Sequence, residues 1–290
     1  MLFSDYVAGV SFGDGVAHVA VLEVRKQHVE LRYLQEISDG SGGELWFLQP
    51  LIARAARPLR KVKKASVAID NASVFLHSFP LDTTLSQVEQ NEHIVWELSN
   101  FLPDFKPGEY IRDVHTLQVH AQQHVNDVFV VAARRSLIFE IQEALAKEKI
   151  ELHVADTSHF GAQYALLVNY PEVKTKTTAL LNVSQARVDG GILHNGRLTR
   201  YRYLPATSAD EVLEFLQSLV NIHSITDVFF YGTNATHSIV NAARQQLKVN
   251  AEMLNPLRRL PVSSRFRDFS VYNGREYRFA PAIGCALRKQ

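Results

Sequence analysis

The sequence of 290 residues has little cysteine and no long hydrophobic run. Its single cysteine, Cys285, excludes a disulfide bond within the chain and is typical of proteins from a reducing compartment. No apolar run approaches the ~20 residues that a membrane-spanning helix needs. The first residues lack the basic and apolar segments of a signal peptide. We therefore expect a cytoplasmic protein that reaches a membrane only through a partner.

The chain also lacks an excess of charge of either sign. Its 31 basic and 30 acidic residues are mixed along the sequence and give a formal net charge of +1. This balance argues against binding to nucleic acid or to an anionic membrane by bulk electrostatics. Hydrophobic residues make up 46% of the sequence, which is enough for a buried core, and the length fits two domains of ordinary size.

The hydrophobic pattern predicts the same order of elements twice. In each half, three strands form a meander, and a helix and a further strand follow it. The first half has strands at 6–12, 18–24, 28–37 and 65–70 with a helix at 44–57, and the second has strands at 178–183, 186–194, 197–204 and 227–231 with a helix at 209–223. This repeat predicts a duplicated α/β protein whose two halves face a central cleft.

Further elements are predicted between and after the two meanders. The middle of the chain has a strand at 74–80 that Pro80 ends, a helix at 85–101 capped by Thr83 or Thr84, strands at 110–120 and 127–133, a helix at 136–148 and a strand at 151–156. Helices at 158–169, 236–247 and 281–288 and a strand at 249–254 complete the order. We predict a first lobe at 1–175 with an inserted subdomain at about 82–155, a shortened second lobe at 176–276, and a C-terminal helix at 277–290 that returns to the first lobe.

Several short segments, in a fixed order along the chain, carry a resemblance to one family. They are Gly9–Gly13, Phe79-Pro80-Leu81, the stretch from Val88 to Pro103, Val130–Arg135, Asn255-Pro256-Leu257 and Ala280–Leu287. With this order the chain resembles the PilM family, the actin-like cytoplasmic proteins of type IV pilus assembly. It is also similar to the cytoplasmic part of GspL and, more distantly, to FtsA. The resemblance implies an actin-like (ribonuclease H-like) α/β fold with duplicated lobes around a cleft and an FtsA/PilM-type inserted subdomain.

The resemblance also implies a nucleotide site, and the residues that should form it are altered. In the actin-like superfamily two hairpins cradle the phosphates, each led by an aspartate, and here the two positions hold Ser11 and Asn182. Without these carboxylates the triphosphate lacks the Mg²⁺ that would neutralise its charge. We therefore expect a vestigial cleft with no catalytic residue, no metal and no ATP hydrolysis, while ATP binding stays open. The residues of this cleft are Ser11, Gly13, Asn182, Ser184, Gly232 and Thr233.

Three local patterns could be mistaken for sites, and each has a structural explanation. Gly13-Asp14-Gly15 predicts a hairpin turn and Asp189-Gly190-Gly191 a strand bulge or kink, because neither fits a phosphate-loop motif. Asp156-Thr157-Ser158 predicts a helix N-cap rather than a nucleophile with its base. No group of histidines has the spacing of metal ligands.

Trp96 is the candidate partner-binding residue of the predicted inserted subdomain. It lies off the apolar arc of its predicted helix, which consists of Val88, Ile94, Val95, Leu98, Phe101 and Leu102. Two interpretations stay open: Trp96 packs on a neighbouring strand, or it faces a partner, as aromatic anchors do.

The function that the resemblance implies is that of an adaptor or scaffold. The protein would belong to the inner-membrane platform of a type IV pilus or a type II secretion system. It would bind the N-terminal cytoplasmic tail of a PilN-like membrane protein, in a groove between the first lobe and the insert. A nucleotide-binding actin-fold enzyme related to sugar or acetate kinases, an FtsA-like polymerising protein, and self-association remain open alternatives.

Overall fold

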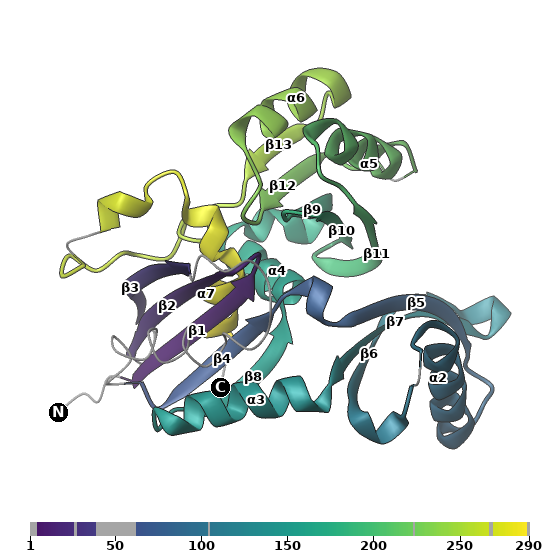
Figure 1. Cartoon of the computed structure of the whole chain (residues 1–290). Coiled ribbons are helices and arrows are strands. Elements are labelled where there is room, and N and C mark those ends of the chain that lie inside the picture. Colours follow the sequence, from purple (N-terminus) through teal and green to yellow (C-terminus); the bar gives the residue numbers. More distant parts are fainter. Residues whose placement is uncertain are drawn as a thin grey trace.

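The computed structural model describes residues 5–25, 28–38, 62–103, 105–222, 224–266 and 269–288. These residues form two five-stranded sheets and one three-stranded sheet with helices around them (Figure 1). The predicted helix at 44–57 lies outside the described residues. Over the described ranges, no helix combines the length and the apolar character that crossing a membrane requires.

The first lobe is built on a sheet with the strand order β3-β2-β1-β4-β8. Its strands are β1 (Asp5–Gly13), β2 (Val16–Arg25), β3 (His28–Ser38), β4 (Lys64–Ile69) and β8 (Glu151–Thr157). The first three form the predicted antiparallel meander, and β4 and β8 continue the sheet in parallel. Helices α3 (Arg135–Lys147) and α7 (Ala280–Leu287) cover its two faces, which explains why β1 is apolar at almost every position.

The second lobe repeats this arrangement with the strand order β11-β10-β9-β12-β13. Its strands are β9 (Thr177–Val183), β10 (Arg187–His194), β11 (Arg197–Pro205), β12 (Asp227–Tyr231) and β13 (Asn250–Met253). Helices α5 (Ala209–Ile222) and α6 (His237–Leu247) lie on the side of this sheet away from the first lobe (Figure 1). A meander continued by two parallel strands therefore occurs twice, as the sequence repeat predicts.

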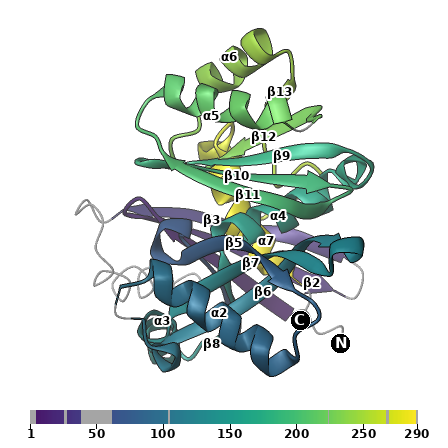
Figure 2. The same cartoon turned by 90° about the vertical axis from the view of Figure 1, so that its right-hand side faces the viewer.

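The insert is a three-stranded antiparallel sheet with α2 (Gln87–Phe101) in front of it (Figure 2). Its strand order is β5-β7-β6, with β5 at Phe75–Asp82, β6 at Tyr110–His120 and β7 at Val125–Arg134. This sheet runs from β5 to β7, and β8 pairs with β4 in the first lobe, while the predicted insert limits of about 82 and 155 stay a prediction. The divisions near residues 175 and 276 stay predictions.

Two expected details of the insert are wrong for identifiable physical reasons. Strand β5 does not end at Pro80 but continues to Asp82, because an edge strand tolerates a residue without an N–H donor. The N-cap of α2 is Ser86, not Thr83 or Thr84, because Ser86 and Glu89 form a reciprocal capping box.

Helix α7 completes the first lobe from the far end of the sequence. It packs against β1 and against α4 (Ser158–Asn169), and its contact with α4 is very close. A methyl group on Gly284 would lie 1.8 Å from the carbonyl oxygen of Gly161. Only glycine fits at this crossing, and Cys285 beside it is fully buried.

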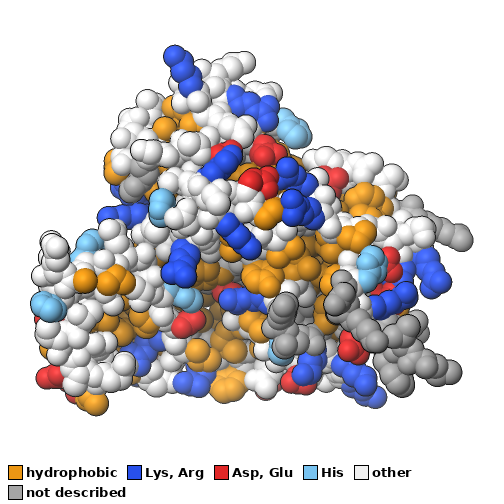
Figure 3. Space-filling view, turned by 180° about the vertical axis from the view of Figure 1, so that it is seen from behind, with side chains coloured by type: hydrophobic (Ala, Val, Ile, Leu, Met, Phe, Trp, Pro, Cys, Tyr) orange, Lys and Arg blue, Asp and Glu red, His pale blue; other side chains and the backbone are white. Residues whose placement is uncertain are grey.

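The surface shows the charge balance that the composition predicts. On the face opposite to that of Figure 1, basic and acidic side chains are interspersed and no large region of one sign is visible (Figure 3). Hydrophobic side chains gather on this face below the second lobe (Figure 3).

Candidate functional site

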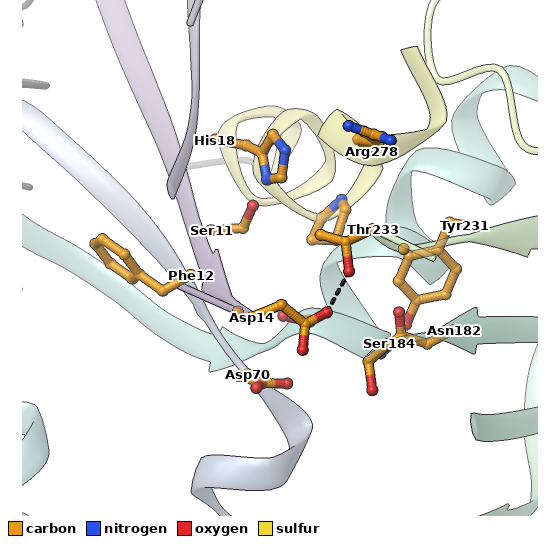
Figure 4. Close-up of a pocket in the computed structure, with 14 residues that line it drawn as sticks. Ser11, Phe12, Asp14, His18, Asp70, Asn182, Ser184, Tyr231, Thr233 and Arg278 are labelled. Carbon is orange, nitrogen blue, oxygen red and sulfur yellow. Dashed lines mark hydrogen bonds between the residues drawn. The ribbon is translucent and has the colours of Figure 1, made fainter. Parts of the chain in front are cut away.

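The six residues predicted for the vestigial cleft lie together around one small cavity between the lobes (Figure 4). They come from β1, from β9 and the turn after it, and from the end of β12. The residues are Ser11, Gly13, Asn182, Ser184, Gly232 and Thr233. The pairing of the two hairpins across a cleft could therefore be located from sequence.

Sequence reasoning missed other residues that line the same cavity. These include Asp14, His18, Asp70, Tyr231 and Arg278. The sequence assigns Asp14 only to a turn, although a carboxylate at the tip of a cleft hairpin is a signal for polar contacts. Asp70 comes directly after the buried strand β4, and such positions at strand ends often carry functional groups.

Asp14 makes the cavity small because its side chain crosses from one lobe to the other. The carboxylate accepts hydrogen bonds from the Thr233 hydroxyl and from the backbone N–H of Gln185, the latter at 3.1 Å (Figure 4). The free volume is about 40 Å³. One water occupies ~30 Å³ of liquid, whereas small-molecule sites measure ~300–1,000 Å³. While this contact is closed, the free space beside it is therefore far smaller than a typical small-molecule site.

Asn182 turns toward the protein rather than toward a metal position. Its Nδ2 donates to Asp189 at 3.4 Å, inside the second lobe. The buried Asp189 carboxylate also accepts hydrogen bonds from Arg187 Nε and from the Tyr201 hydroxyl, each at 2.8 Å. Burial, together with the Asp189 charge, raises the pKa of Tyr201 well above its usual value. These hydrogen bonds lie within the second lobe and hold the Asp189 carboxylate in place.

Asp70 is a cavity carboxylate whose surroundings change its acidity strongly. Burial raises its pKa from 3.8 to about 6, and the nearby charges of Asp14 and Asp189 add to this effect. Asp70 accepts one backbone hydrogen bond, from Ala72 at 3.3 Å. In the part of the chain that the structure describes, no three His, Cys, Asp or Glu side chains form a group that could hold a metal ion.

A larger hollow of about 660 Å³ lies in the second lobe beyond Thr233. It is lined by the starts of α5 and α6, by Ser184 and by Arg278. Gly232 has a φ of +103° and approaches Val183 and Asn182 so closely that a side chain there would clash. This glycine places Thr233 at the border between the hollow and the Asp14 contact.

The pair Ser158 and His159 forms no nucleophile with its base. Ser158 donates to the carbonyl of Ile69, and Thr157 caps α4, as the N-cap prediction requires. His159 is fully buried, which lowers its pKa to about 3. Its ring fills the space that Gly191 leaves free, because a methyl group there would lie 2.1 Å from Nε2. The irregularity in β10 falls between Ile192 and Leu193, directly after the segment Asp189-Gly190-Gly191 at which the sequence predicts a bulge or kink.

Trp96 lies on the surface of the insert, with 59% of its area exposed. Of the predicted apolar arc of α2, only Ile94 and Leu98 are buried, while Val88 and Phe101 are exposed. The helix covers only a small three-stranded sheet, so its apolar stripe is wider than the surface available to bury it.

Rings from α2 and β5 form a continuous series that ends at Trp96. Neighbouring centroids lie 4.2–6.4 Å apart, in the order Phe75, Phe101, His77, Phe79, His93, Trp96. We name these six residues the ring series. Glu97 lies beside it, 4.0 Å from His77 and 3.5 Å from His93.

Two hollows separate the insert from the first lobe. The larger one, about 450 Å³, lies on the α2 side of the insert sheet and is lined by Phe75, Leu102, Tyr110, Ser136 and Glu140 among others. The smaller one, about 130 Å³, lies between β6 and β8 and includes Ile111. The ring series leads into the larger hollow, because Phe75 belongs to both.

These features define an actin-like α/β protein with an inserted subdomain and a small cavity between its two lobes. Residues 25–204 match the protein family described as type IV pilus assembly protein PilM. Because this match spans more than half of the chain, the chain belongs to the PilM family. No curated protein sequence matches the chain.

Solved structures share the fold at low sequence identity. A chain of a PilM-PilN type IV pilus biogenesis complex has a TM-score of 0.79 at 17% identity, with 97% of this chain and 98% of that chain covered. A Bacteroides thetaiotaomicron protein with an actin-like ATPase fold has a TM-score of 0.56 at 11% identity, covering 87% and 91%. The cytoplasmic domain of EpsL, an inner-membrane component of the Vibrio cholerae type II secretion system, has a TM-score of 0.51 at 10% identity, covering 80% and 84%.

Proposed function

We propose that this chain is a cytoplasmic scaffold of the inner-membrane platform of a type IV pilus or a type II secretion system. It binds the N-terminal cytoplasmic tail of a PilN-like membrane protein and meets the membrane through that partner. Membership of the PilM family supports this role. The fold shared with a chain of a PilM-PilN complex supports the kind of partner.

The observation that carries the binding site is the ring series along the edge strand β5. In the described residues β5 pairs only with β7, so its outer edge offers unpaired backbone groups. An extended tail that adds to such an edge gains main-chain hydrogen bonds, and neighbouring side chains give it specificity. We place the tail along β5, from the 450 Å³ hollow to Trp96.

The chemistry of this surface indicates a tail with apolar and basic residues. The exposed rings of Trp96 and Phe101 suit aliphatic or cationic side chains. Helix α2 carries Glu89, Glu92 and Glu97 and contains no Lys or Arg. A basic residue of the tail would meet a negative surface here.

The scaffold works without ATP hydrolysis in this proposal. The cleft has Ser11 and Asn182 at the two acid positions, and Asn182 is used by the internal network with Asp189.

Calorimetric titration with a synthetic tail of the PilN-like protein from the same genome tests the proposal. Trp96→Ala should weaken binding by more than ~1 kcal/mol, because a central aromatic anchor is lost. Its melting temperature should stay nearly unchanged, because the side chain is mostly exposed.

Two control variants separate the possible outcomes. Ile222→Ala removes a side chain that is 66% exposed on α5, far from the insert, and should change nothing. Ile111→Ala tests the smaller hollow between β6 and β8. A loss with Ile111→Ala but not with Trp96→Ala would move the tail to that hollow, and no binding by the wild type would reject the partner.

A further inference from the structure

The first cleft hairpin projects a carboxylate beyond its own strands. Asp14 and Gly15 form the turn between β1 and β2, with φ values of 53° and 71°. Both central residues of this two-residue turn are left-handed, which matches the twist of a β-hairpin. The Asp14 side chain therefore points away from its own sheet and toward the second lobe (Figure 4).

Two donors from separate elements of the second lobe converge on one oxygen of this carboxylate. The Gln185 N–H belongs to the turn between β9 and β10, and the Thr233 hydroxyl follows β12. A backbone N–H and a hydroxyl aimed at the same point form an arrangement that accepts an anion. The close approach of Gly232 to Val183 brings these two donors together.

We propose that Asp14 is a built-in anionic ligand that holds the two lobes closed without any bound nucleotide. The chain supplies its own anion to the donors of the second lobe. An external phosphate would have to displace Asp14 and would then meet the carboxylate of Asp70, which lines the same cavity. The Asp14 contact therefore keeps the cleft closed whether or not a ligand is present.

The rate of amide hydrogen exchange at Gln185, measured by NMR, reports directly on the hydrogen bond from this N–H to Asp14. Asp14→Gly removes the carboxylate and keeps the turn, because glycine adopts a φ of 53° without strain. Exchange at Gln185 should accelerate by about tenfold or more, since a charge-assisted hydrogen bond is lost. The Ser184 N–H bonds to Arg187 within its own hairpin at 3.0 Å and should keep its rate.

Distances between spin labels on the two lobes show whether the lobes separate when the Asp14 contact is removed. Glu143→Cys on α3 and Gln245→Cys on α6 replace exposed side chains of the two lobes, and the fully buried Cys285 should not react with the label. Asp14→Gly should broaden the distance distribution toward longer values, and Thr233→Val should do so from the other side of the contact. Asp210→Asn, an exposed carboxylate on α5, serves as the control.

Two results would overturn the proposal. One is wild-type exchange at Gln185 in folded Asp14→Gly. The other is an unchanged distance distribution in both Asp14→Gly and Thr233→Val. If Asp14→Gly does not fold, Thr233→Val alone decides, because it leaves the hairpin turn untouched.

Discussion

Replacing Asp70 by asparagine should stabilise the protein at neutral pH. Burial raises the pKa of this carboxyl group from 3.8 to about 6 in the folded chain. The folded state therefore binds the proton more strongly than the unfolded state, and the ionised form is disfavoured by folding. A shift of about two units corresponds to about 3 kcal/mol of lost stability, fully present above pH 6 and absent below about pH 4.

Asparagine removes the charge and keeps the local geometry. Asp70 caps the short 3-10 turn that starts at Asn71, and Asn is an equally good cap for the Ala72 N–H. We expect Asp70→Asn to raise the free energy of unfolding by about 2–3 kcal/mol at pH 7.5, with the gain shrinking as the pH falls from 6 to 4. Glu36, whose pKa the His18 hydrogen bond lowers to about 2, affects stability mainly below this window and is common to both proteins.

Urea unfolding of both proteins between pH 4 and pH 8 measures this difference. Asp210→Asn, at an exposed position on α5, controls for the loss of a carboxylate as such. A gain that is the same at every pH would refute the assigned acidity of Asp70. A destabilised Asp70→Asn at pH 7.5 would show instead that the ionised carboxylate is a required partner in the cleft.

Two further predictions concern packing and nucleotide. Gly284→Ala should lower the free energy of unfolding by ~3 kcal/mol in thermal melts, because the added methyl group would clash with the Gly161 carbonyl oxygen. Gly108→Ala is the control and should have little effect, because the space around Gly108 is open. Calorimetry with Mg-ATP should detect no binding tighter than roughly millimolar, about −4 kcal/mol, and a turnover that disappears when Gly13 is made bulky would contradict the closed cleft.

The sequence predicts most of the fold because the hydrophobic pattern of each element and the order of the elements can be read from short segments of the chain. Short apolar runs and the turn at Asn195-Gly196 mark the second meander, and the same order in the first half predicts the duplicated lobes. The pairing of the strands around the insert cannot be predicted in this way. Whether β5 and β8 pair with the insert or with the first lobe depends on long-range partners that no local pattern encodes.

The candidate site likewise combines positions that the sequence predicts with contacts that it does not predict. Positions such as Ser11 and Asn182 are recognisable because they stand at the ends of predictable strands, and the structure brings them together. The contact from Asp14 to Gln185 and Thr233 joins residues 171 and 219 positions apart, so only the assembled lobes reveal it. The sequence alone also cannot decide whether Trp96 is buried or exposed, because the area that a helix can bury depends on the width of the sheet beneath it.

The last helix of the chain has a consequence for how the protein is made. Helix α7 fills the core of the first lobe beside Val7 and Leu22, and the segment before it bonds to Leu31 on β3 through Pro261 and Ser263. A ribosome delivers β1 before α7, so the first lobe keeps an open apolar face until α7 has been made. The second lobe, whose strands and helices are contiguous in sequence, can fold while the chain is still growing. We therefore expect the first lobe, which contains the N-terminal strands, to complete its core after the second lobe has formed.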